Sequence, residues 1–229
     1  MSAAVKIDFK NVFGPGFLLV FSALMLAALV DQSLNKQIER VIQSRDGLSN
    51  MIFVWGGLSL FSSLLFPMII SFLCCHTLAG LANGRREFIK SKFELGLLET
   101  LRAWGKTFLW TFAFILPGLV AYTYYFLTPF VVIFSRDYAD GKVDALKHSA
   151  KLTSMFFWRL NLWLTVFYMG VPFVLSTLLD EKRVFRLSPL TATLSVLLET
   201  LLVFMFHYLI LKPFIHYLNE VEAPDVAAV

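Results

Sequence analysis

The chain has 229 residues, of which 58% are hydrophobic and 16% charged, and its net charge is +4. Soluble globular proteins carry about 25% charged residues and fewer than half apolar ones. The apolar residues gather in long uncharged runs, which excludes an ordinary soluble domain. The composition therefore indicates an all-α integral membrane protein, with one membrane domain over residues 1–229.

Each crossing of a bilayer core about 30 Å thick requires roughly 20 apolar helical residues. Five stretches approach or exceed that length: 11–30, 51–83, 107–135, 160–179 and 187–211. We expect the third stretch to break at Pro117 and Gly118, because proline lacks an amide donor and glycine tolerates a bend. The tail over residues 221–229 is expected to be disordered.

The basic residues favour one topology, because short loops rich in Lys and Arg remain in the cytoplasm. If all five stretches cross, eleven basic residues lie on one side and nine on the other. If the third stretch bends and returns, the division becomes fourteen against six. We therefore predict four full spans plus one bent or re-entrant helical pair, with both termini in the cytoplasm.

Two basic loops are predicted to form amphipathic helices, over about 87–104 and 141–153. The apolar stripe of the first suits either the membrane interface or packing on the protein's own spans, and the two are compatible. Asp140 or Asp144 is expected to cap the second helix. The expected interfacial anchors are Trp104, Phe157, Trp158 and Arg159. The expected contacts with anionic lipid are Arg85, Arg86, Lys90, Lys147 and Lys151.

Glu199 is the strongest single candidate for a functional residue, because placing an ionised acid at the middle of a membrane span costs roughly 2.5–3.5 kcal/mol. It should face protein or water, or carry a proton. His207 follows eight residues later, and Asn161 begins the fourth stretch, so these three residues form the candidate intramembrane polar site. The alternatives are a proton or ion relay, a polar anchor for a lipid head group, and an acid that is merely hydrogen-bonded within the bundle.

Several other functions lack a sequence signal. Cys74-Cys75-His76 has no second Cys/His pair at zinc spacing, so we expect no metal and no cofactor. No phosphate-binding glycine loop or catalytic motif is recognisable, so we do not expect an enzyme. The basic residues lie beside spans, where orientation and anionic lipid explain them, so we expect no nucleic-acid partner.

Part of the chain resembles a known family. Pro117-Gly118 is followed by a run from Thr128 to Val132 (TPFVV), by a run from Asp144 to Thr153 (DALKHSAKLT) and by Phe157-Trp158-Arg159. This order resembles the bacterial membrane-domain family that is fused in some proteins to glycerophosphoryl diester phosphodiesterases, and related stand-alone inner-membrane proteins. The catalytic barrel of those fusions is absent, so the resemblance implies a bacterial inner-membrane location and no phosphodiesterase activity.

The leading functional hypothesis is a non-enzymatic inner-membrane protein that acts through packing. It would be a scaffold or accessory subunit of a membrane complex, or a factor in envelope or lipid homeostasis. Its expected partners are membrane lipids, other membrane proteins and copies of itself. The alternative is a small transporter or channel component that uses the broken helix together with Glu199.

Overall fold

The computed structural model describes residues 7–43, 50–80, 85–179 and 184–222, and side chains are not described at 85–90 and 178–179. These parts are helical and contain no strand, as the composition predicted. A short 3-10 helix, η1 (Phe9–Phe13), precedes the long helices. The long helices are α1 (Pro15–Gln43), α2 (Met51–Leu78), α3 (Arg85–Ala113) and α10 (Pro189–Val221), and the shorter ones are α4 (Ile115–Tyr125), α5 (Thr128–Phe134), α6 (Arg136–Ala139), α7 (Ala145–Met155), α8 (Phe157–Thr165) and α9 (Val171–Leu179).

Within the described residues, five segments are long and apolar enough to cross a membrane. They are Pro15–Gln43, Met51–Leu78, Ile115–Phe134, Phe157–Thr177 and Pro189–Val221. All five overlap the predicted stretches, and α1 and α10 extend beyond the predicted ends by more than two helical turns. The chain therefore has the makeup of a multi-pass membrane protein.

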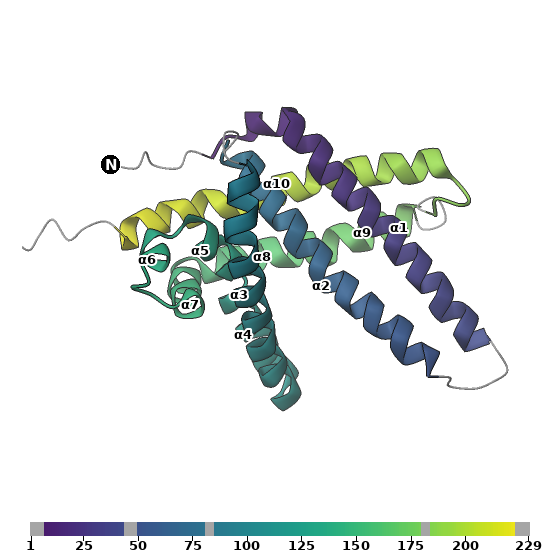
Figure 1. Ribbon diagram of the computed structural model, residues 1–229, viewed down its shortest axis with the longest axis horizontal. Coiled ribbons are helices and arrows are strands. Elements are labelled where there is room, and N and C mark those ends of the chain that lie inside the picture. Colours follow the sequence, from purple (N-terminus) through teal and green to yellow (C-terminus); the bar gives the residue numbers. More distant parts are fainter. Residues whose placement is uncertain (1–6, 44–49, 81–84, 180–183, 223–229) are drawn as a thin grey trace, which may run out of the picture.

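The helices form three arms that leave a common base (Figure 1). One arm is the antiparallel pair α1 and α2, the second is the pair α3 and α4, and the third contains α8 and α9, with the first half of α10 running alongside and contacting α1 and α2. We call the base the hub and define it as α5, α6, α7 and residues 204–222. Because the arms diverge, each one leaves much of its apolar surface uncovered by the others.

The hub contains most of the packed core. Phe130 of α5 contacts the rings of His207 and Phe214 on α10. Phe206 of α10 contacts Phe126, which lies just before α5. The base of α2 also packs here, and Cys74, Cys75 and Leu78 are fully buried. Large aromatic side chains in edge contact contribute about 0.5–1.5 kcal/mol per pair beyond their burial. The hub thus fixes the base of every arm.

The helix break in the third stretch lies at Phe114, so the prediction of a break at Pro117 and Gly118 is wrong. Phe114 is extended, with φ −160° and ψ 142°, and it separates α3 from α4. Pro117 is the third residue of α4, where an amide has no partner within the helix, so its missing donor costs nothing there. The segment predicted as a separate interfacial helix, 87–104, is part of α3, which continues to Ala113.

Gly118 permits the close approach of α3 and α4. A Cβ atom at this position would lie 2.8 Å from the Cα atom of Thr111 on the facing helix. The tip of the hairpin is strongly apolar and uncovered, with Phe112 88% exposed and Phe114 74% exposed. At the open end of the hairpin, the Lys106 ammonium lies 5.8 Å from the ring centre of Tyr125.

An ion pair joins α3 to the start of α7 in the hub. The Arg102 guanidinium on α3 lies 2.6 Å from the Asp144 carboxylate, which also accepts hydrogen bonds from the backbone amides of Leu146 and Lys147. Asp144 therefore caps α7, which confirms one of the two predicted capping residues.

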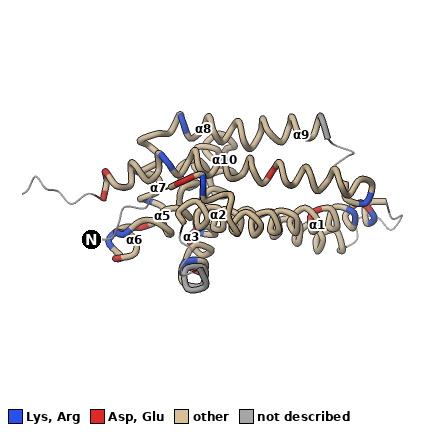
Figure 2. The backbone as a smooth tube through the Cα atoms, turned by 90° about the horizontal axis from the view of Figure 1, so that it is seen from above, with Lys and Arg blue, Asp and Glu red and all other residues tan. Residues whose placement is uncertain are grey.

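Figure 2 shows charged residues around α6, α7 and the far end of α1, with long stretches of α2, α9 and α10 nearly free of them.

We expect Gly118→Ala to destabilise the hairpin. The added methyl group would clash with the backbone at Thr111, and overpacking of this kind costs about 1–3 kcal/mol. Thermal unfolding in detergent should show a lower Tm. Gly105→Ala on α3 is the matched control, because nothing lies within 4 Å of its added Cβ and alanine is the better helix former. Equal Tm values for the two variants would contradict this packing.

Candidate functional site

A cavity with a partly polar lining lies between α1, α2 and α10. We call it the distal cavity, because it opens away from the hub, and its volume is about 520 Å³. Its polar lining comes from all three helices: Asp31, Gln32, Ser62, Ser63, Ser195 and Glu199. Two carboxyl groups from different helices therefore share one cavity inside the arms.

Glu199 also borders a second cavity. This inner cavity of about 320 Å³ lies between α2, α9 and α10, and His207 and Ser71 form its other end. Ser195 and Glu199 are four residues apart, and so are Val203 and His207, so these side chains lie along one face of α10. Glu199 therefore borders two cavities within the protein, which is compatible with the expectation that it faces protein or water.

His207 is 4% exposed and is held by two short contacts. Its Nδ1 lies 2.8 Å from the carbonyl oxygen of Val203, and its Nε2 lies 2.8 Å from Oγ of Ser71. Because a carbonyl oxygen only accepts, the Nδ1–H tautomer donates to Val203, and the Ser71 hydroxyl donates to Nε2. A neutral His207 is fully satisfied here and links α10 to α2.

Asn161 does not join Glu199, contrary to the predicted three-residue site. Its Oδ1 atom lies 3.1 Å from the hydroxyl of Thr123 on α4, and its amide nitrogen donates to the carbonyl oxygen of Phe157. A polar side chain in an apolar setting is stabilised by a hydrogen bond to a nearby group, and for Asn161 that group is the Thr123 hydroxyl on the adjacent helix. The polar site on α10 therefore contains Glu199 and His207 without Asn161.

The predicted interfacial anchors divide into two kinds. Trp104 is half-buried and packs against Phe108 and Tyr122, so it joins α3 to α4. Trp158 is 83% exposed, and Arg159 beside it is also exposed, while Phe157 packs against Tyr124. The apolar stripe predicted for residues 87–104 packs against the protein at Phe93, whose ring contacts that of Phe72 on α2.

The predicted lipid contacts on α7, Lys147 and Lys151, are exposed on the surface of the hub. Those at Arg85, Arg86 and Lys90 lie outside the described side chains. No group of three or more His, Cys, Asp or Glu side chains among the described residues has the geometry to hold a metal ion. Cys74 and Cys75 are fully buried at the base of α2.

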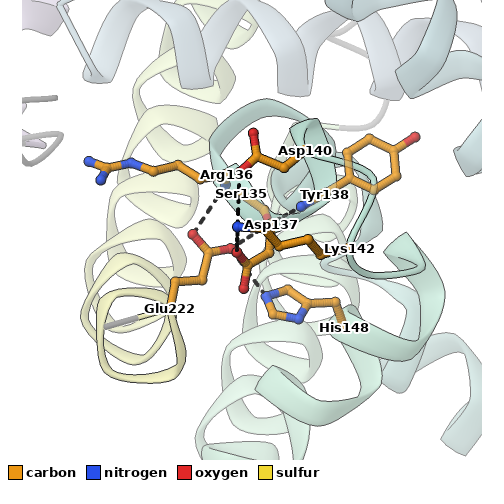
Figure 3. Close-up of polar contacts among 8 residues, drawn as sticks. All are labelled: Ser135, Arg136, Asp137, Tyr138, Asp140, Lys142, His148 and Glu222. Atoms are coloured by element: carbon orange, nitrogen blue, oxygen red, sulfur yellow. Dashed lines mark hydrogen bonds and ion pairs between the residues drawn. The ribbon is translucent and has the colours of Figure 1, made fainter. Parts of the chain in front are cut away.

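A carboxylate clamp in the hub was missed by sequence reasoning (Figure 3). Glu222 accepts a hydrogen bond from the Ser135 hydroxyl through Oε1 and one from the Arg136 backbone amide through Oε2. The same carboxylate lies 3.5 Å from Nε2 of His148 on α7. Glu222 therefore joins the end of α10 to α6 and α7. Residues 221 and 222, predicted as the start of a disordered tail, are ordered, and residues 223–229 lie outside the described part of the chain.

The environment of His148 disfavours its charged form. Burial lowers the pKa of this imidazole from its ordinary value near 6.5, and the charge of Lys151 lowers it further. The Glu222 and Asp137 carboxylates act in the opposite direction but do not outweigh burial. The folded hub therefore holds His148 as the neutral imidazole near neutral pH.

Comparison with known proteins places this chain in no established group: no family model, no curated protein and no solved structure matches it. The resemblance to the membrane domain fused to glycerophosphoryl diester phosphodiesterases remains a prediction.

The lowered pKa of His148 predicts acid sensitivity. Unfolding releases this histidine to its higher ordinary pKa, so the unfolded state binds more protons below about pH 6.5 and stability is lost as the pH falls. We expect the Tm in detergent to decrease between pH 7.5 and pH 5.5. The decrease should be smaller in His148→Gln, which cannot titrate, and an equal decrease in both proteins would refute the assignment.

Proposed function

We propose that this protein is a non-enzymatic component of the bacterial inner membrane that acts by packing. It serves as a scaffold or accessory subunit of a membrane complex, or as a factor in envelope or lipid homeostasis. The observation that carries the proposal is the contrast in burial between α1 and α10. Only 6% of the most apolar window of α1 is buried within the protein, against 44% for α10.

This contrast has a physical consequence for partners. A helix of 29 residues that buries so little against its own chain must be covered by lipid or by other membrane helices. The hub, in contrast, is packed internally and can hold the arms apart without help. A protein built in this way presents helices to neighbours instead of enclosing a catalytic chamber.

The hairpin of α3 and α4 supports a re-entrant placement. Its tip is apolar and uncovered, whereas Lys106 near its base is the last charged residue before the turn at Phe114. Eight helical residues from Lys106 to Phe114 reach about 12 Å, which is less than half of the hydrocarbon core. The hairpin would dip into one leaflet and return, which leaves the basic segments around it on the cytoplasmic side with both termini.

The second candidate function, a transporter or channel component, receives mixed support. The two cavities beside Glu199 favour a polar route into the arms. However, the described lining of both cavities comes from other helices than α3 and α4, so the broken helix does not combine with Glu199 as that hypothesis required. We therefore retain packing as the main function.

Native purification tests the packing role. In mild detergent or nanodiscs, we expect the protein to retain a stoichiometric protein partner, a further copy of itself or a specific lipid. A photoreactive residue at Phe61, which is exposed on α2, should form a discrete adduct, while the same residue at buried Phe72 on the same helix should not. A solitary monomer with no discrete adduct and no retained lipid would contradict the role.

Cysteine labelling tests the topology. Single cysteines at Lys92 and Lys147 should react with an impermeant reagent from the same side of the membrane, because the hairpin between them returns. A cysteine at Lys36, at the far end of α1, should react from the opposite side. The native Cys74 and Cys75 are buried and serve as the unlabelled background. Labelling of positions 92 and 147 from opposite sides would show that the segment crosses.

A further inference from the structure

We propose that an open groove between the hairpin of α3 and α4 and the helix α7 binds one anionic phospholipid. Figure 1 shows α7 beside the base of the hairpin, and the groove there has a volume of about 670 Å³. It shares no lining residue with the distal or inner cavity, and we call it the hairpin groove. The proposal deepens the packing role and rests on the re-entrant placement of the hairpin.

The hairpin side of the groove is apolar and uncovered. Among its lining residues, Leu116 is 75% exposed, Trp110 53% and Val120 45%. The described lining contains no Asp, Glu, Lys or Arg. Exposed apolar surfaces of this kind mark sites of contact with membranes or other proteins. Within a bilayer leaflet, this side of the groove fits the acyl chains of a lipid.

Two lysines of α7 lie at the end of the groove nearest the hub. This helix buries one face, which includes Ser149 and Leu152, and exposes the other at Lys147 and Lys151. Ala150 lines the groove and is a neighbour of both lysines on the helix surface. Both ammonium groups are therefore within reach of the hub end of the groove.

A third lysine approaches the same end from α3. Lys106 lies four residues before Trp110, so both side chains are on the face of α3 that borders the groove. The Lys106 ammonium group is 5.8 Å from the ring centre of Tyr125, which also lines the groove. Basic side chains from two helices thus surround one end of an apolar groove.

The positive charge of this end is not neutralised by neighbouring acids. The carboxylates of Glu99 and Asp144 lie 3.3 and 2.6 Å from the guanidinium of Arg102, which pairs with both. None of the three lysines makes an ion pair within the described part of the chain. A positive end and an apolar length complement the anionic head group and the acyl chains of a phospholipid.

The hub end of the groove is built on fixed backbone. The hydroxyl groups of Ser149 and Thr153 on α7 donate to the carbonyl oxygen of Tyr124, at 2.8 and 3.4 Å. Tyr124 is close to the end of α4 and lines the groove. These contacts hold α7 against the hairpin, and a site formed before binding pays less ordering entropy when the ligand enters.

The depth of the hairpin selects a lipid over a soluble anion. In the re-entrant arrangement Lys106 lies at the membrane interface, and the chain from it to Phe114 reaches about 12 Å into the leaflet. A lipid phosphate beside the lysines would therefore lie at head-group depth, with its acyl chains along the apolar side. A soluble anion would occupy the positive end alone and leave the apolar side uncovered.

Native mass spectrometry of the protein in detergent tests the site directly. We expect one dioleoyl phosphatidylglycerol to bind saturably, and phosphatidylethanolamine with the same chains to bind more than about tenfold more weakly. Lys106→Gln, Lys147→Gln and Lys151→Gln should each weaken phosphatidylglycerol binding about fivefold, the contribution of one basic residue at an anionic surface. Lys36→Gln on α1 is the matched control, because Lys36 is exposed and lies in another arm.

Two uncharged substitutions test the apolar part. Ala150→Leu adds bulk to the lining without changing the charge, and it should weaken phosphatidylglycerol binding. Ala150 is only half-buried, so this variant should fold. Phosphatidylglycerol with brominated acyl chains should quench a larger fraction of the tryptophan emission in the wild type than in Trp110→Phe. Trp55→Phe on α2 is the matched control and should retain the quenching seen in the wild type.

Three results would overturn the lipid site. They are equal binding of the two lipids, unchanged binding of phosphatidylglycerol in all three lysine variants, and a crosslink from position 116 to a second copy or a partner protein in place of bound lipid. Loss of lipid binding with a retained protein partner would reject the lipid site alone. Labelling of positions 92 and 147 from opposite sides of the membrane would reject the re-entrant placement, whatever the lipid result.

Discussion

The packing of α10 into the hub is the interaction on which the rest of the molecule depends. This helix has 33 residues and is about 50 Å long, so it extends from the hub into the third arm without interruption. Phe204, Ile210, Leu211 and Phe214 are buried within the hub, and Glu222 fastens its end to α6 and α7. The arms diverge from the hub, and cavities lie between them.

The polar residues of the arms follow from this geometry. A polar side chain cannot face lipid without cost, so it takes a partner on a neighbouring helix or borders a cavity. His207, in the hub part of α10, pairs with Ser71 on α2, and Asn161 pairs with Thr123 on α4. Farther from the hub, Asp31, Ser195 and Glu199 border the distal cavity.

The sequence predicted those features of the structure that depend only on a local pattern of residues. Uncharged runs located the apolar helices, because length and hydropathy alone determine whether a helix can cross a bilayer. Asp144 was recognisable as a cap because its role requires only the next three residues. Glu199 was recognisable because an acid inside an uncharged run is unusual wherever the run is placed.

What the sequence could not predict depends on contacts between distant segments. Pro117 suggested a break, but proline is tolerated in the first turn of a helix, and the turn at Phe114 is set by the packing of Gly118 against Thr111. Glu222 binds residues 86 and 87 positions earlier in the chain, and no local pattern marks that pairing. Asp31 looked like the boundary of a span, and only the position of α10 shows that it shares a cavity with Glu199.

The central claim is that α1, α2 and the tip of the hairpin formed by α3 and α4 lie in the bilayer while α6 and α7 remain outside it. Spin labels in nanodiscs test this claim directly through their relaxation by oxygen, which partitions into lipid, and by a water-soluble nickel chelate. Labels at Phe114 on the hairpin tip and Phe61 on α2 should be accessible to oxygen and protected from nickel, and a label at Lys147 on the hub should show the reverse. Nickel accessibility at Phe114 equal to that at Lys147 would contradict the account.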